Sequence, residues 1–244
     1  MRLSLFSLFF VASLAHAAPP QPDAFAPVFE LAGIRLLCDQ SAPLAQRGMD
    51  ESQHAALGRA FAADAMCLDL AKRLTGKLDQ IQLNKAHELL DSPLARRFTE
   101  AERAVGESGA EGLAAYRAQL VERPPREDRL ALVRRLDAAA HTTVLATLLR
   151  YEIGKTQALL TLRARGESID EETLSRQTQV QADALRVSSA QAVESFMLYA
   201  YRQMPSEQLA AYAELYEQVP VTLLLESSAE VLPGIFAERR AALK

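Results

Sequence analysis

The stretch Leu78-Asp-Gln-Ile-Gln-Leu-Asn-Lys-Ala-His-Glu-Leu-Leu90, followed by Asp91-Ser92-Pro93, decides the fold class of this 244-residue chain. Asp79 and Gln82 have the spacing of a capping box, which opens a helix by satisfying its first free backbone N–H groups. Apolar residues then recur at helical spacing, and Pro93 suits the first turn of another helix. The stretch therefore predicts a short helix, a tight turn and a second helix.

A second segment, Met204-Pro-Ser-Glu-Gln-Leu-Ala-Ala-Tyr-Ala-Glu-Leu-Tyr216, repeats this pattern. It also follows a helical stripe, and a proline again stands after it, one residue out of register. The identical pairs in the two segments are Gln82 and Gln208, Leu83 and Leu209, Glu88 and Glu214, and Leu89 and Leu215. We infer one supersecondary unit used twice; chance similarity between two leucine-rich amphipathic helices is the alternative.

These residues resemble the signature of exported bacterial helical domains known only as domain of unknown function 2059. That signature reads approximately Phe-Ser-x-x-Glu-Leu, a spacer, and Phe-Tyr-x-Ser-Pro-x-Gly. Its counterparts here are Leu209, Leu215-Tyr216 and Leu90-Asp91-Ser92-Pro93, while the departures are Gln208, Ala95 and Val219. The resemblance implies an all-helical exported protein with two degenerate copies of the domain, and it implies no activity.

The remainder of the chain has the composition of an all-α protein. Apolar residues make up 49% of it, and glycine and proline are sparse. We expect a multi-helix array or bundle of nine or ten helices, built from related halves at residues 18–123 and 124–244, which meet at Pro124-Pro125. One helix is expected to carry Leu31, Ile34 and Cys38, and another to run from Glu51 to Thr75. Pro220 and Pro233 are expected to punctuate the C-terminal part.

The first 17 residues have the pattern of a secretory signal peptide. Arg2 is followed by an apolar run over residues 3–14, and Ala15-His16-Ala17 fits a cleavage site near Ala17. The run is shorter than the roughly 20 residues of a membrane span. We therefore expect a periplasmic protein without a stable membrane anchor after cleavage.

Charge and cysteine content narrow the function classes. The formal net charge is −4, and the arginine pairs are isolated among acids, so nucleic acid is not an expected partner. Cys38 and Cys67 are an even pair in an exported chain, which predicts a disulfide. Two buried free thiols are the alternative, and neither cysteine has a histidine at metal-ligand spacing or a Cys-x-x-Cys partner.

The strongest candidate for reactive chemistry is weak. His87 and Asp91 stand one helical turn apart, and Glu88 between them would act on a metal-bound water in a hydrolase. Aspartate replaces the second histidine of the usual motif, and a surface histidine beside an acid is the ordinary interpretation. No serine or cysteine nucleophile motif and no phosphate-binding glycine loop occurs in the sequence, so we expect no enzyme activity, no metal and no cofactor.

Two further groups of residues are candidates for contacts. Tyr199, Tyr201, Tyr212 and Tyr216 would anchor a ligand or partner, or would cap the core. Glu152 and Lys155 interrupt the stripe of a long helix, where a solvated helix edge is the ordinary interpretation and a partly buried pair the alternative.

The leading function hypothesis is a non-enzymatic interaction or envelope-associated module with an unknown protein partner. A carrier of a small apolar ligand within the bundle is the alternative. An enclosed apolar pocket of some hundreds of Å³ would favour the carrier.

Overall fold

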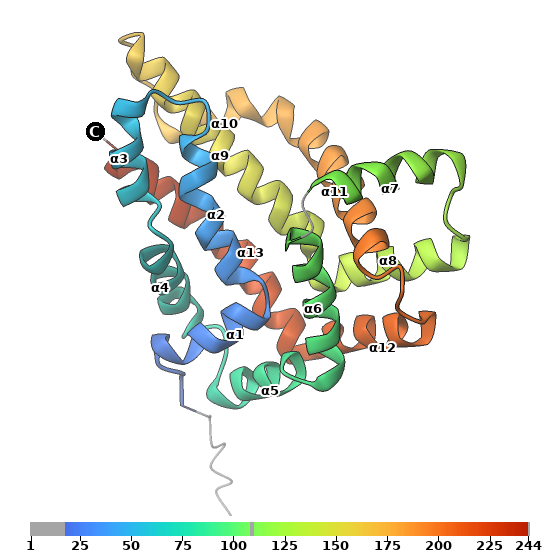
Figure 1. The fold of residues 1–244 in the computed structure, drawn as a ribbon. Coiled ribbons are helices and arrows are strands. Elements are labelled where there is room, and N and C mark those ends of the chain that lie inside the picture. The colour runs from blue at the N-terminus through green and yellow to red at the C-terminus, as the bar shows by residue number, and fades with distance from the viewer. Residues whose placement is uncertain (1–17, 108–109, 244) are drawn as a thin grey trace, which may run out of the picture.

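The structure is a computed structural model that describes residues 18–107 and 110–243, and it confirms the all-α fold class (Figure 1). Every regular element in these residues is a helix. In chain order they are η1 (Pro22–Phe25), α1 (Ala26–Leu31), α2 (Ile34–Gln46), α3 (Glu51–Ala60), α4 (Ala63–Leu74), α5 (Gln80–Leu90), α6 (Pro93–Glu107), α7 (Ala110–Glu122), α8 (Glu127–Ala140), α9 (Thr142–Ala164), α10 (Glu171–Thr178), η2 (Gln179–Gln181), α11 (Ala182–Ala200), α12 (Ser206–Tyr216) and α13 (Val219–Ala242).

The described helices outnumber the nine or ten expected, because two predicted helices are each broken in two. Gly33 adopts a left-handed backbone at φ 72°, so the run carrying Leu31 and Cys38 divides into α1 and α2. The predicted helix from Glu51 to Thr75 is also wrong, since it breaks at Phe61 into α3 and α4. The Phe61 side chain is fully buried, and its ring lies 5.6 Å from that of Phe236. Core packing by Phe61 therefore accompanies the break.

Helix α13 also differs from the expectation at one of its two prolines. Pro220 lies in the first turn, where its missing N–H is harmless, as predicted. Pro233 lies inside the helix, which continues to Ala242, so the expected break there is wrong. An interior proline costs a helix about 3 kcal/mol. Burial of Leu232, Ile235 and Phe236 around it offsets that cost.

Helix α13 occupies the centre of the molecule. It packs against α4 and α5 on one side and against α9 on the other, while α2 bridges α4 and α9 (Figure 1). The remaining helices pair as α8 with α12 and as α9 with α11. The hydrophobic core draws side chains from both predicted halves, from Phe25 to Leu243.

Two local predictions are confirmed. Asp79 accepts a hydrogen bond from the Gln82 backbone N–H at 2.8 Å, and the Asp79 N–H donates to the Gln82 side chain at 2.9 Å, so α5 opens on the expected capping box. Cys38 of α2 and Cys67 of α4 form the predicted disulfide, with 6.1 Å between their Cα atoms. The cross-link ties together two helices that already pack against each other.

The order of helices is the same around both sequence segments of the predicted repeat. Helix α5 precedes the proline-initiated α6, and α12 precedes α13 with Pro220 in its first turn. Both short helices contain 11 residues. This local likeness agrees with the pattern in the sequence, and the duplication of the two halves stays a prediction.

One described helix, α13, is long and apolar enough to cross a membrane by length and composition alone. In this fold it is the central helix, and its apolar residues are covered by α4, α5 and α9. Burial in the core explains its composition without a membrane. The predicted signal peptide and its cleavage site at Ala17 lie outside the described residues.

Candidate functional site

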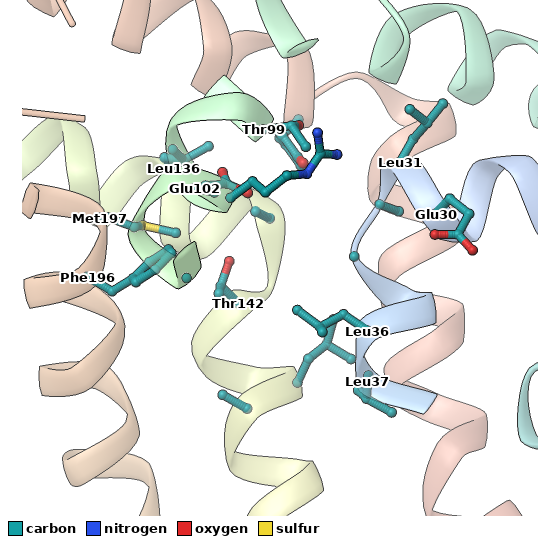
Figure 2. Close-up of a pocket in the computed structure, with 18 of the residues that line it drawn as sticks. Glu30, Leu31, Leu36, Leu37, Thr99, Glu102, Leu136, Thr142, Phe196 and Met197 are labelled. Atoms are coloured by element: carbon teal, nitrogen blue, oxygen red, sulfur yellow. The ribbon is translucent and has the colours of Figure 1, made fainter. Parts of the chain in front are cut away.

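A cleft of about 780 Å³ opens between the α1–α2 segment and α6, and helices α8, α9, α11 and α12 complete its walls (Figure 2). Figure 2 shows Leu31, Leu36 and Leu37 on one side and Glu102 and Thr99 on the other. The volume lies within the range of pockets that hold small organic ligands, about 300–1,000 Å³. The bundle therefore contains an apolar pocket of the size that a ligand carrier requires.

The walls of the cleft are mainly aliphatic, because several helices turn apolar residues toward it. Their side chains come from α2, α8, α9 and α11, namely Leu37, Leu136, Leu145, Leu149, Phe196 and Met197. Leu36 extends this surface at the rim and is 60% exposed. Covering these carbon atoms with an apolar ligand would remove them from water, which is favourable at about 25 cal/mol per Å².

Three of the predicted tyrosines meet at one part of the cleft wall. The Tyr201 hydroxyl donates a hydrogen bond to the Glu102 carboxylate, and the hydroxyl groups of Tyr212 and Tyr216 lie 3.3 Å apart. The Phe98 ring stacks on Tyr212 with 4.1 Å between their centroids. The tyrosine rings thus belong to the core, as the sequence allowed, while atoms of all three also line the cleft.

Glu102 is the only acid at this part of the wall. Its side chain keeps some exposure through the cleft, but protein atoms surround it in most other directions, and this burial raises its pKa. The hydrogen bond from Tyr201 acts in the opposite direction, because it stabilises the charged carboxylate. No lysine or arginine in the described part of the chain forms an ion pair with Glu102. Its charge has no cationic partner there.

The same environment keeps the tyrosines neutral. Burial raises the pKa of Tyr201, Tyr212 and Tyr216, and the nearby negative charge of Glu102 raises it further. Each hydroxyl therefore keeps its proton at physiological pH. This part of the cleft offers hydroxyl groups and one carboxyl group within otherwise apolar walls.

The fourth tyrosine, Tyr199, lies apart from this group. Its ring is 5.2 Å from that of Tyr116 on α7, and the Arg202 guanidinium stands 4.0 Å from its centroid. The structure thus brings together three of the four tyrosines that the sequence singled out, and it assigns Tyr199 to the packing of α7 against α11.

The residues of the metal hypothesis do not converge. Glu88 forms an ion pair with Lys85 at 2.9 Å, and Asp91 accepts two hydrogen bonds from Arg96, which lower the pKa of its carboxyl group. His87 lies on the same helix, half-buried. Across the described residues, no group of three or more His, Cys, Asp or Glu side chains is placed to hold a metal ion.

A second polar cluster is buried between α9, α10 and α13. Lys155 lies 2.6 Å from Glu171 and 3.8 Å from Glu152, and Arg240 lies 2.6 Å from both acids. Arg240 also donates to the Glu152 backbone carbonyl at 3.1 Å, although it is only 1% exposed. The interpretation of Glu152 and Lys155 as a solvated helix edge is therefore wrong, because α10 and α13 cover them.

Glu102 was not singled out in the sequence, although a signal for it exists. Ala95, Phe98, Glu102 and Val105 recur at helical spacing on α6, and the three apolar members are buried. An acid within an inward-facing stripe is unusual, because a buried carboxyl group needs a partner. That exception to the apolar pattern is a sequence signal for this part of the cleft.

No protein-family model matches the chain, and neither a curated protein nor a solved structure shows significant similarity to it. The resemblance to domain of unknown function 2059 therefore stays a prediction. The geometry of the cleft has to carry the functional argument alone.

Proposed function

We propose that this protein binds a small, largely apolar ligand in the cleft between α2, α6 and α9, and that it acts as a carrier rather than as an enzyme. The observation that supports the proposal is the cleft itself, about 780 Å³ in volume, with aliphatic walls and one polar part. Apolar walls supply affinity, and a few placed polar groups orient the ligand.

The cleft favours the carrier over the interaction module, which was the leading hypothesis from sequence. A module that only docks onto protein needs no internal apolar space, and unfilled apolar space lowers stability. The described residues also contain no group of metal-ligating side chains that would support the hydrolase hypothesis.

We further propose that the protein works in the periplasm after removal of its first 17 residues. The disulfide between Cys38 and Cys67 is compatible with an oxidising compartment. Apolar molecules have low solubility in an aqueous compartment, so a soluble carrier with an internal cleft would be useful there.

Titration with N-phenyl-1-naphthylamine tests the proposal, since this uncharged probe becomes fluorescent in apolar surroundings. We expect saturable binding of one probe per chain. Ala146, on α9, lines the cleft, so Ala146→Trp should fill part of it and weaken binding by about tenfold or more.

Ala131→Trp is the matched control, because Ala131 is exposed on α8 and does not line the cleft. This variant should bind the probe as the unmodified protein does. Circular dichroism verifies that both variants stay folded. Absence of saturable binding, or equal binding by a folded Ala146→Trp variant, would contradict the proposal.

A further inference from the structure

We propose that the ligand carries a protonated amine, and that Glu102 receives this cation beside the Tyr201 hydroxyl. The inference rests on the proposed function and specifies its ligand as a cationic amphiphile, an apolar body with one ammonium group. The carboxyl group of Glu102 lies in the cleft wall, and Tyr201 is its only hydrogen-bond partner among the described residues.

The first argument is the missing counter-charge. A carboxylate that is largely removed from water is costly unless a cation or several hydrogen bonds compensate for it. Glu102 has one hydrogen bond and no ion pair in the described residues, whereas Glu152, the most buried acid, lies near both Lys155 and Arg240. The protein thus compensates one buried acid internally and leaves the acid in the cleft available to a ligand.

The second argument is the surroundings of this carboxylate. The faces of aromatic rings attract cations, and Tyr201, Tyr212 and Tyr216 all line the cleft near Glu102. Their hydroxyl oxygens can also accept hydrogen bonds from an ammonium group, which has donors and no acceptor. The aliphatic walls then receive the hydrocarbon part of the same molecule.

The charges at the rim were weighed as well. Glu30 and Arg103 line the cleft, and both side chains are exposed. With Glu102 ionised, these three charges sum to one negative charge, which attracts a cation rather than an anion. Arg103 follows Glu102 directly on α6, and neighbouring residues on a helix point about 100° apart. An anionic ligand would use Arg103 at the rim and would leave Glu102 uncompensated.

The test compares decylamine, decanol and decanoate as competitors of N-phenyl-1-naphthylamine at neutral pH, at concentrations where none of them forms micelles. The three share one hydrocarbon chain and differ only in the head group. We expect decylamine to bind about tenfold tighter than decanol and tighter still than decanoate. Glu102→Gln should remove most of this preference, because the amide keeps an acceptor for Tyr201 and loses the charge.

Glu30→Gln is the matched control, since it removes an acid from the exposed rim, and it should keep most of the preference for the amine. If decanol or decanoate binds the unmodified protein as tightly as decylamine, the inference is overturned while the apolar cleft stands. If neither the probe nor any competitor binds, the proposed function fails as well. A folded Glu102→Gln variant with an unchanged preference would also overturn the role of Glu102.

Discussion

Reduction of the Cys38–Cys67 disulfide should lower the stability of the protein by about 3.6 kcal/mol at 25 °C, as estimated from the loop-closure entropy of its 29-residue separation. The two helices it joins stay in contact without the bond, because α2 and α4 also pack through apolar side chains. We therefore expect the reduced protein to fold and to unfold at a lower denaturant concentration.

Urea unfolding followed by circular dichroism, with and without a thiol reductant, measures this effect. For a slope of about 1–3 kcal/mol per molar urea, the midpoint should fall by about 1–4 M on reduction. The reduced protein keeps both sulfur atoms in place, so the comparison separates the cross-link from side-chain packing.

The double variant Cys38→Ala/Cys67→Ala is the control, and reductant should not change its midpoint. It should be less stable than the reduced protein, because Cys38 is fully buried and its truncation leaves a small cavity. Equal midpoints of the oxidised and reduced forms would refute the argument from loop entropy. Alkylation of either thiol in the unreduced protein would refute the disulfide itself.

Three other predictions follow from buried and capping groups. Arg240→Met should destabilise the protein by about 3–5 kcal/mol in urea unfolding, because it leaves Glu152 and Glu171 with Lys155 alone; a loss below about 1 kcal/mol would contradict this. Burial raises the pKa of Glu102 above its ordinary value of 4.5, so the folded state favours the protonated form, and the corresponding stability is lost as pH rises through the raised pKa. Glu102→Gln should therefore flatten the decline in stability above pH 4.5, and unfolding curves with unchanged pH dependence would argue against it. Asp79→Ala removes one side of the capping box of α5 and should cost about 1 kcal/mol, whereas Asp79→Ser should restore most of the loss in the same assay.

The buried ion pairs illustrate how tertiary context changes the role of a residue. In the sequence, Glu152 and Lys155 are an ordinary pair at i and i+3, of the kind found on exposed helix surfaces. In the fold, α10 contributes Glu171 and α13 contributes Arg240, and these neighbours bury the pair. The residues that decide this burial lie about one to six helical turns or far more along the chain, so local spacing could not predict it.

The helix breaks follow the same rule. The start of α5 was predictable because Asp79 and Gln82 interact within one turn. The break between α3 and α4 was not, since Phe61 leaves the helix where it packs on Phe236 from the other end of the chain. Pro233 is the opposite case, a local helix breaker that the packing of α13 overrides.

The amino-acid sequence by itself determined the all-helical class and the capping box at Asp79, because these depend on spacing within a few turns, and it also indicated the cysteine pairing. Only the tertiary structure decided where the cleft lies and which acid lines it. The cleft exists because α6 stands apart from α2 while α9 and α11 connect their surroundings, and Glu102 faces it by the placement of α6. Relative placement of distant helices depends on the packing of the whole core, which no local pattern encodes.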